Sequence, residues 1–162
     1  MTVLHDKVIV ETTVAVPPAR AFEIFTRETD LWWRRGPKYR VAGHRPGVLE
    51  LEPRQGGRLM EKFETAKGFG KAVVVGTVLA WEPPSRLLFE WRNVNFAPAE
   101  KTEVEVRFEE TRGGNTRVTL EHRGWAAIRA DHPARHEKQG REFIAFIGGW
   151  WGDQLTALRL YI

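Results

Sequence analysis

Two histidines in the stretch His132-Pro-Ala-Arg-His136 stand four residues apart, a spacing that can bring two imidazoles to one face of a helix. A metal site needs at least a third ligand, and the adjacent Glu137 does not have a useful spacing for that role. We therefore expect a polar entrance to a helix here. The sequence predicts no metal and no cofactor.

His122 and Glu61 are polar residues that strand alternation places on apolar faces. His122 shares its face with Val118 and Leu120, and Glu61 shares its face with Phe63. A polar group that faces a core must be paired or must face a cavity. Either residue could orient a ligand, or act as an acid or base with a pKa shifted by burial. The alternatives are a His122 bonded to backbone at the rim of the sheet and a Glu61 paired with an arginine. A one-residue slip at a bulge would reverse both faces.

Nucleophilic and phosphate chemistry have no support in the sequence. Ser85 is the only serine, it stands in a Pro-Pro turn, and the chain has no cysteine. The Gly-x-Ser-x-Gly pattern of a nucleophile elbow is absent from the sequence. No pair of glycines leads from a strand into a helix with the spacing of a phosphate loop. We therefore name no catalytic residue.

Aromatic residues are the strongest functional hint. The chain has seven Trp and nine Phe, and several of them could line one apolar chamber: Trp32, Trp33, Phe63, Trp91, Trp150 and Trp151. Aromatic residues at helix and strand spacings more often form a plain core, and a partly open chamber is a small variation on such a core. With Glu61 and His122, the expected ligand-binding set is Trp32, Trp33, Glu61, Phe63, Trp91, His122 and Trp150.

These residues must be positioned by a sheet and a long terminal helix. Alternation and turn signals predict strands at Val8–Val16, Val48–Glu52, Arg58–Glu64, Lys71–Trp81, Arg86–Arg92, Thr102–Glu110 and Thr116–Arg123. Short helices are expected at Ala19–Thr26 and around Leu31–Trp33. Sequential strands joined by tight turns imply a curved antiparallel sheet of about seven strands, whose apolar face needs a cover. We predict an α+β domain, 1–162, with a cavity between the sheet and the helix.

The cover is the helix predicted at Phe143–Ile162. At about 100° per residue its apolar stripe contains Phe143, Phe146, Ile147, Trp150, Leu158 and Tyr161, widened by Ile144, Trp151, Leu155 and Ile162. On the opposite face Gly148, Gly152 and Thr156 recur every four residues and leave a shallow groove. We expect this groove to contact either a loop of the same chain or a second subunit, which would make a homodimer, with plain solvent exposure as the alternative.

Composition narrows the class of protein. The chain has 162 residues, 42% hydrophobic and 28% charged, as in soluble globular proteins. The lack of cysteine fits a reducing cytoplasm, and Asp153, Gln154 and Arg159 argue against a membrane-spanning final helix. The net charge is +4, but the basic cluster around Arg34–Arg45 is expected to be a solvated surface loop, so nucleic acid is disfavoured as a partner.

Several short motifs in this order resemble the START-like, or SRPBCC, superfamily with its helix-grip fold. They are Val14-Ala-Val-Pro-Pro-Ala-Arg-Ala-Phe22, Asp30-Leu-Trp-Trp33, Gly56-Gly57-Arg58, Val78-Leu-Ala-Trp-Glu-Pro-Pro-Ser-Arg-Leu87, and Gly149-Trp150 followed by Leu155 and Leu158. More narrowly, the chain resembles the branch related to the C-terminal domain of the activator of the heat-shock chaperone ATPase (the Aha-type branch). Relatives in this superfamily include lipid and hormone binders, polyketide cyclases and co-chaperone domains.

Three functions follow as hypotheses. The leading one is a binding protein for a small hydrophobic or aromatic ligand held between the sheet and the C-terminal helix. The second, implied by the Aha-type resemblance, is a chaperone-interacting module with a role in the stress response. The third is a cyclase or hydrolase-like enzyme that uses His122 and Glu61 as acid-base groups.

Overall fold

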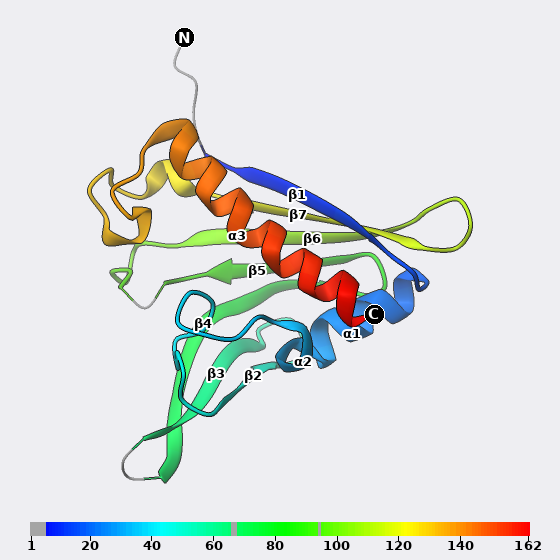
Figure 1. Cartoon of the computed structure of the whole chain (residues 1–162), viewed down its shortest axis with the longest axis horizontal. Helices are drawn as coiled ribbons and strands as arrows, with labels where there is room; N and C mark the ends of the chain where they lie inside the picture. The colour runs from blue at the N-terminus through cyan, green and yellow to red at the C-terminus, as the bar shows by residue number, and fades with distance from the viewer. Residues whose placement is uncertain (1–5, 66–67, 94) are drawn as a thin grey trace.

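Over residues 6–65, 68–93 and 95–162, which the computed structural model describes, seven strands form one antiparallel sheet that curves around a long helix (Figure 1). The strand order is β1-β7-β6-β5-β4-β3-β2. The strands are β1 (Val8–Val14), β2 (Gly47–Leu51), β3 (Arg58–Thr65), β4 (Gly68–Glu82), β5 (Arg86–Trp91), β6 (Thr102–Glu110) and β7 (Thr116–Arg123). Each strand is hydrogen-bonded to the strand before or after it in sequence, except that β1 pairs with β7.

Helices close the concave side of this sheet. Helix α1 (Pro18–Arg27) and helix α2 (Thr29–Trp32) follow β1, and helix α3 (Gly140–Tyr161) ends the chain. Short 3-10 helices lie at η1 (Trp125–Ala127) and η2 (Pro133–Arg135). The predicted α+β helix-grip architecture, with two short helices after the first strand and a long C-terminal helix, is confirmed.

Strand alternation explains why the sheet has one apolar face. In β6, Val104, Val106 and Phe108 are at most 2% exposed, and in β7 Val118 and Leu120 are fully buried. These five side chains face α1 and α3, as the alternation predicts. Strand β1 ends at Val14, two residues earlier than predicted. Its partner Thr116 is the first residue of β7, so β7 has no residue left to pair with the chain beyond Val14.

A bulge interrupts the alternation in the middle of the sheet. Leu59 pairs with Gly76 and Met60 with Val74, so Val75 is an extra residue on β4. The interruption buries Met60, which the alternation places on the solvent face, and it turns the buried Val75 toward the cavity described below. Glu61 keeps its predicted inward orientation and is 2% exposed.

Helix α3 is rotated slightly from the predicted orientation. Its fully buried residues are Phe143, Trp151, Gln154, Leu155 and Leu158. Tyr161, predicted in the centre of the stripe, is 40% exposed, and Trp150 is half-buried. Apolar residues cover more than half of this helix, so periodicity alone does not fix its rotation. The packing of β1 against α3 does so, and it buries the polar Gln154, whose side-chain oxygen accepts a hydrogen bond from the Arg34 N–H at 3.0 Å.

Three glycines in the middle of α3, Gly148, Gly149 and Gly152, have different surroundings. A Cβ added at Gly148 would stand 3.1 Å from a methyl group of Val8, so this glycine lets β1 approach the helix. A Cβ at Gly149 or at Gly152 would have no atom within 4 Å, and Thr156 is exposed. The expected close contact is therefore made by strand β1 of the same chain at Gly148, and the rest of the small-residue face stays open.

No helix within the described residues is both long enough and apolar enough to cross a membrane.

The adjacent glycines Gly148 and Gly149 give a stability test of this packing. Gly149→Ala should raise the free energy of unfolding by up to ~1 kcal/mol, because alanine restricts the unfolded chain and meets no neighbour. Gly148→Ala should gain less, because its methyl group presses on Val8. Urea unfolding of the two variants measures the difference, and an equal gain at both positions would contradict the packing of β1 on the helix.

Candidate functional site

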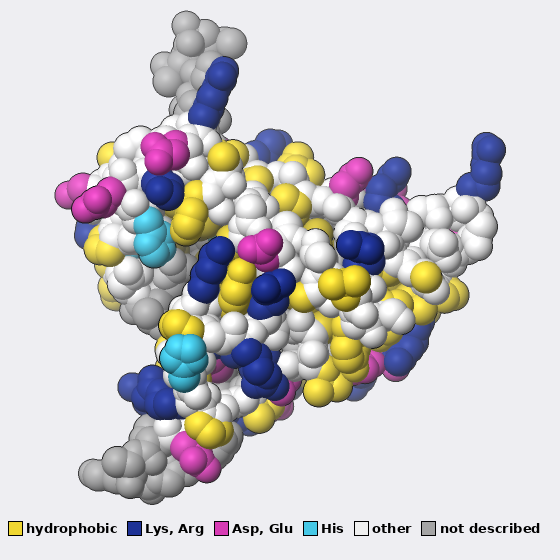
Figure 2. Space-filling model, viewed as in Figure 1, with side chains coloured by type: hydrophobic (Ala, Val, Ile, Leu, Met, Phe, Trp, Pro, Cys, Tyr) yellow, Lys and Arg dark blue, Asp and Glu magenta, His cyan; other side chains and the backbone are white. Residues whose placement is uncertain are grey.

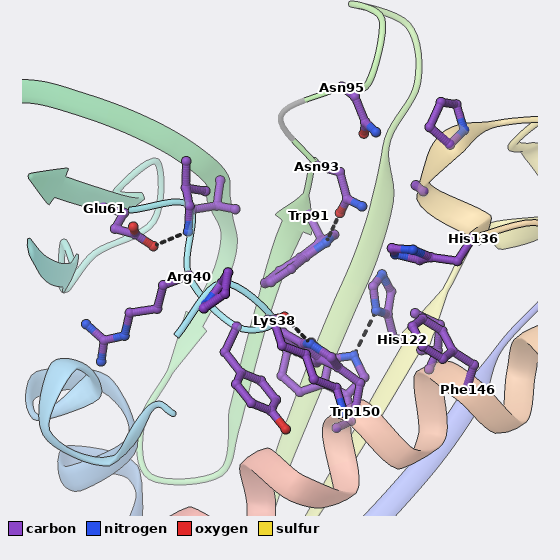
Figure 3. Close-up of a pocket in the computed structure, with 18 of the residues that line it drawn as sticks. Lys38, Arg40, Glu61, Trp91, Asn93, Asn95, His122, His136, Phe146 and Trp150 are labelled. Atoms are coloured by element: carbon purple, nitrogen blue, oxygen red, sulfur yellow. Dashed lines mark hydrogen bonds between the residues drawn. The ribbon is translucent and has the colours of Figure 1, made fainter. Parts of the chain in front are cut away.

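A cavity of about 390 Å³ lies between the sheet, helix α3 and two irregular segments (Figure 3). The first is the α2–β2 loop, residues 33–46, and the second is the β7–α3 segment, residues 124–139. Its wall contains Pro37, Lys38, Tyr39, Arg40, Val41, Leu49, Glu61, Val75, Trp91, Asn93, Asn95, His122, Trp125, Pro133, Ala134, His136, Phe146, Ile147, Trp150 and Trp151. The space-filling view shows the molecule hollowed between these two segments, with Lys and Arg side chains gathered on the loop beside the hollow (Figure 2).

The structure brings four of the seven expected ligand-binding residues to the wall of this cavity. They are Glu61, Trp91, His122 and Trp150. The other three lie elsewhere, and each has a packing role of its own. Trp33 stacks on Trp91 from behind, with ring centroids 6.1 Å apart.

Trp32 and Phe63 are the remaining two. The Trp32 indole N–H donates to the carbonyl oxygen of Phe25 at 3.2 Å within the helical corner formed by α1 and α2. Phe63 lies in a separate surface depression under the guanidinium group of Arg45, 4.5 Å from its ring centre.

His122 is held by a directional chain of hydrogen bonds at the floor of the cavity. The Trp151 indole N–H donates to His122 Nδ1 at 2.9 Å. Because Nδ1 accepts, a neutral ring carries its proton on Nε2, which then donates to Thr102 Oγ1 at 2.7 Å. The Thr102 hydroxyl group in turn donates a hydrogen bond to the carbonyl oxygen of Trp91 at 3.1 Å. Every polar atom of this buried imidazole is therefore already used inside the protein.

The environment of His122 keeps it uncharged. Its ring is packed edge-on against Trp91 and Trp151, and a third tryptophan, Trp125, lies 4.9 Å away. Burial lowers the pKa of His122 from 6.5 to about 3. An imidazole in this state cannot take up a proton near neutral pH, so the geometry gives it a structural role rather than that of a general base.

Glu61 is the second buried polar residue of the wall, and its carboxylate holds the α2–β2 loop. One oxygen accepts from the backbone N–H of Val41 at 3.0 Å, and the other accepts from the backbone N–H of Ala42. The alternative, a Glu61 paired with an arginine, is not found among the described residues. Figure 3 shows the Glu61 side chain reaching from the sheet to the loop.

A buried ion pair fixes the same loop from the other end. Arg40 is 6% exposed, donates to Asp30 Oδ1 at 2.6 Å, and also donates to the carbonyl oxygens of Arg34, Asp30 and Trp33. Burial opposes ionisation of Asp30, but the Leu49 N–H and the Arg40 guanidinium lower the pKa of its carboxyl group below the usual range. The expectation of a solvated basic loop is therefore wrong at Arg40, because the guanidinium satisfies the carbonyl oxygens of a tight turn.

Aromatic polar groups complete the attachment of the α2–β2 loop to the helix. The Trp150 indole N–H donates to the carbonyl oxygen of Lys38 at 2.8 Å, and the Tyr39 hydroxyl donates to Asp153 at 2.9 Å. The Trp33 indole N–H donates to the carbonyl oxygen of Tyr39 at 3.0 Å. The loop is thus a fixed wall of the cavity.

The two histidines of the His132–His136 pattern do not share a helix face. His132 is 1% exposed and its Nδ1 accepts from the Ala134 N–H at 3.0 Å, whereas His136 is exposed and lines the cavity. The backbone separates them, because η2 lies between them and His136 has a left-handed φ of 50°. Among the described residues no group of three His, Cys, Asp or Glu side chains is close enough to hold a metal ion.

Asn93, Asn95 and His136 are wall residues outside the expected ligand-binding set. Asn93 and Asn95 follow β5 in an irregular stretch, where periodicity carries no signal. The sequence marks His136 only by its spacing from His132. Trp125 and Trp151 also belong to the wall, and the high aromatic content of the chain is the signal that points to them.

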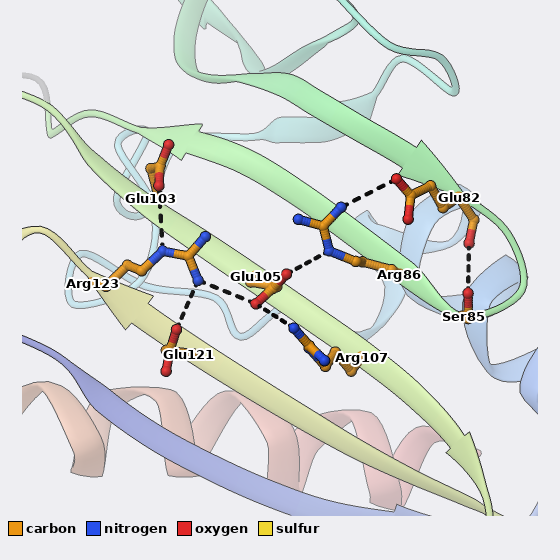
Figure 4. A network of polar contacts seen from close by, with 8 residues as sticks. All are labelled: Glu82, Ser85, Arg86, Glu103, Glu105, Arg107, Glu121 and Arg123. Carbon is orange, nitrogen blue, oxygen red and sulfur yellow. Dashed lines mark hydrogen bonds and ion pairs between the residues drawn. The ribbon is translucent and has the colours of Figure 1, made fainter.

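A second polar cluster lies on the opposite face of the sheet (Figure 4). Glu105 is 6% exposed and is paired with three arginines. Arg107 lies on the same strand at 3.3 Å, Arg123 on β7 at 3.1 Å, and Arg86 on β5 is the third. Burial opposes ionisation of Glu105, yet hydrogen bonds from Arg86 and Arg123 lower the pKa of its carboxyl group. This cluster ties β5, β6 and β7 together across the sheet and is separate from the cavity.

Comparison with known proteins places the chain in a family. A model of the family described as "Activator of Hsp90 ATPase homolog 1-like protein" matches residues 15–156. No curated protein matches the chain. The match and the fold confirm the predicted START-like, Aha-type resemblance.

Solved structures share the fold at low sequence identity. The HSP90 activator PFC0360w from Plasmodium falciparum is 18% identical, with 96% of this chain and 94% of that chain covered and a TM-score of 0.62. The Aha1 dimer from Colwellia psychrerythraea is 16% identical, with 94% and 92% covered and a TM-score of 0.60. The anthrahydroquino-gamma-pyrone synthase Txn09 is 24% identical, with 99% and 100% covered and a TM-score of 0.55.

The neutral state of His122 has a consequence for stability that can be measured. Its pKa is lowered on folding, so the unfolded chain binds a proton below pH 6.5 that the folded chain does not bind until about pH 3. The contribution of His122 to the free energy of unfolding should therefore be fully present above pH 6.5. Between pH 6.5 and about pH 3 it should fall by about 1.4 kcal/mol for each pH unit of acidification. Urea unfolding at several pH values should show that His122→Asn is less stable than wild type near neutral pH.

The gap between His122→Asn and wild type should shrink as the pH falls. The control is His44→Asn, the same substitution at an exposed position. Stability curves of wild type and His122→Asn that run parallel with pH would contradict a neutral, buried His122.

Proposed function

The chain belongs to the Activator of Hsp90 ATPase homolog 1-like family, and from that premise we propose that it binds a small hydrophobic or aromatic molecule in the cavity between the sheet and α3. The observation that carries the proposal is the cavity wall itself. Its volume of about 390 Å³ lies within the range of small-molecule sites. Its deep part is built from Trp91, Trp125 and Trp151, which are at most 9% exposed.

The wall is pre-formed, which favours binding. The α2–β2 loop is attached to β3 through Glu61, which accepts from the Val41 N–H, and to α2 through Arg40, which donates to Asp30. It is attached to α3 through Trp150, which donates to the carbonyl oxygen of Lys38. A ligand entering such a site would not have to order the loop, so less of the interaction free energy would be lost. The structurally similar Txn09 is an anthrahydroquino-gamma-pyrone synthase, and an aromatic compound of that kind supports the same class of ligand for this chain.

An acid-base enzyme using His122 and Glu61 receives less support. Both nitrogens of His122 and both oxygens of Glu61 bond to groups of the protein. A general acid or base must be within reach of a proton on the substrate, and these atoms are already occupied.

Filling the cavity tests the binding function. Lipids, flavonoids and polyketide-like compounds are screened by thermal shift, and the best compound is measured by calorimetry. Ile147→Trp, in the cavity wall, should weaken its binding at least about tenfold by occupying the space. Ala145→Trp, the same new residue on an exposed position of the same helix, should bind as wild type does. A silent screen over a broad library, or equal loss in both variants, would count against the proposal.

A co-chaperone role is the second candidate, and the description of the matched family favours it. In this role the protein would contact a chaperone and change its ATPase rate, and would serve the stress response. The test is the ATPase rate of a bacterial Hsp90 with and without the protein. An unchanged rate at saturating protein would remove this candidate, and a changed rate that Ile147→Trp leaves intact would place the chaperone contact outside the cavity.

A homodimer through the Gly148, Gly152 and Thr156 face stays a proposal as well. The Colwellia relative is described as a dimer, which supports it. Strand β1 already covers Gly148, so a second copy would contact the open part around Gly152 and Thr156. The elution volume in gel filtration tests the oligomeric state.

A further inference from the structure

The deep wall of the cavity offers a ligand almost no free polar atoms. The indole N–H groups of Trp91, Trp150 and Trp151 donate to Asn93, to the carbonyl oxygen of Lys38 and to His122. Glu61 is the only acid among the wall residues, and both of its oxygens are bonded to the α2–β2 loop. The buried Trp125 indole N–H is the exception in the deep wall, since it has no hydrogen-bond partner among the described residues. A ligand therefore meets aromatic faces and at most this one donor at the floor, and the other polar groups that it can reach lie nearer the mouth.

Asn93 is the side chain at the mouth whose polar orientation is fixed. The Trp91 indole N–H donates to Asn93 Oδ1 at 2.7 Å. An indole nitrogen is a donor only, so the amide oxygen must face it and the amide NH₂ group must face away. Figure 3 shows the Asn93 nitrogen turned from Trp91 toward the space in front of His136. Asn93 thus presents a hydrogen-bond donor to the cavity.

The rest of the mouth has the same character. The Lys38 side chain is 58% exposed, and its ammonium nitrogen lies 3.7 Å from a carboxylate oxygen of Asp153. His136 and Glu137 have left-handed φ values of 50° and 62°, a conformation that side chains other than glycine seldom adopt. This backbone directs the His136 imidazole toward the opening, where its ring lies 5.1 Å from that of Phe146. Strained backbone of this kind is often retained at binding sites.

We propose that the cavity is selective for a planar aromatic molecule that carries a carbonyl oxygen, and that this oxygen accepts a hydrogen bond from the Asn93 amide NH₂ at the mouth. The rings would lie against Trp91 and Trp150. This inference rests on the proposed binding function and adds the chemical class of the ligand and the residue that selects it. The Asn93 amide NH₂ group favours a ligand with an acceptor oxygen over a hydrocarbon of the same shape, because the hydrocarbon would leave this donor without a partner.

The matched compounds 9-fluorenone and fluorene test this selectivity, because they share one ring system and differ by a carbonyl group. Their dissociation constants are measured by calorimetry for wild type and for Asn93→Asp. The aspartate keeps an oxygen for the Trp91 N–H but replaces the amide donor by a second acceptor. The preference for fluorenone over fluorene should fall about tenfold in Asn93→Asp, while the affinity for fluorene stays within about twofold.

Asn115→Asp is the control for charge, since it adds the same charge on an exposed residue of the β6–β7 turn, outside the cavity wall. It should keep the wild-type preference. Equal loss of preference in both aspartate variants, or a preference that Asn93→Asp leaves unchanged, would overturn the selectivity and leave the binding function standing. Failure of both compounds to bind wild type would overturn the inference together with binding of such aromatic molecules in this cavity.

Discussion

The requirement that a buried polar group be hydrogen-bonded is the constraint on which the rest of this structure depends. His122 lies at the centre of the molecule, where a charged imidazole would be costly. The protein keeps it neutral by giving each ring nitrogen one partner, Trp151 on one side and Thr102 on the other. That chain of bonds joins α3, β7, β6 and β5, so the helix, the sheet and the floor of the cavity share one polar connection.

The same requirement explains the α2–β2 loop. An irregular segment that covers a cavity has backbone groups that no sheet or helix satisfies. Here side chains from β3, from α3 and from the loop itself satisfy them. Glu61 accepts from two loop N–H groups, Arg40 donates to the loop carbonyl oxygens of Trp33 and Arg34, and Trp150 donates to that of Lys38. Polar groups that could have performed acid-base chemistry are used to hold the wall. The cavity that results is aromatic at its floor and carries N–H donors at its mouth, which suits binding and selection more than proton transfer.

The periodicity of apolar residues predicts the sheet and the terminal helix. The alternation in β6 and β7 predicts their buried faces because each has only one apolar face to offer. Periodicity could not predict the rotation of α3, because its apolar residues cover more than half of the helix and the contact of Val8 with Gly148 decides the outcome. It also could not predict the loop contacts. The Trp150 to Lys38 bond joins residues 112 positions apart, and a side-chain to backbone bond has no repeating pattern in sequence. His136 depends on a left-handed backbone that its residue type does not indicate.

Nitrogen-15 NMR of the two ring nitrogens of His122 reports whether the ring is neutral and where its proton lies. We expect a neutral ring with its proton on Nε2 from about pH 7 down to about pH 4, because burial lowers the pKa of this residue to about 3. A ring that becomes protonated within this range, or that carries its proton on Nδ1, would contradict a neutral, hydrogen-bonded His122 at the floor of the cavity.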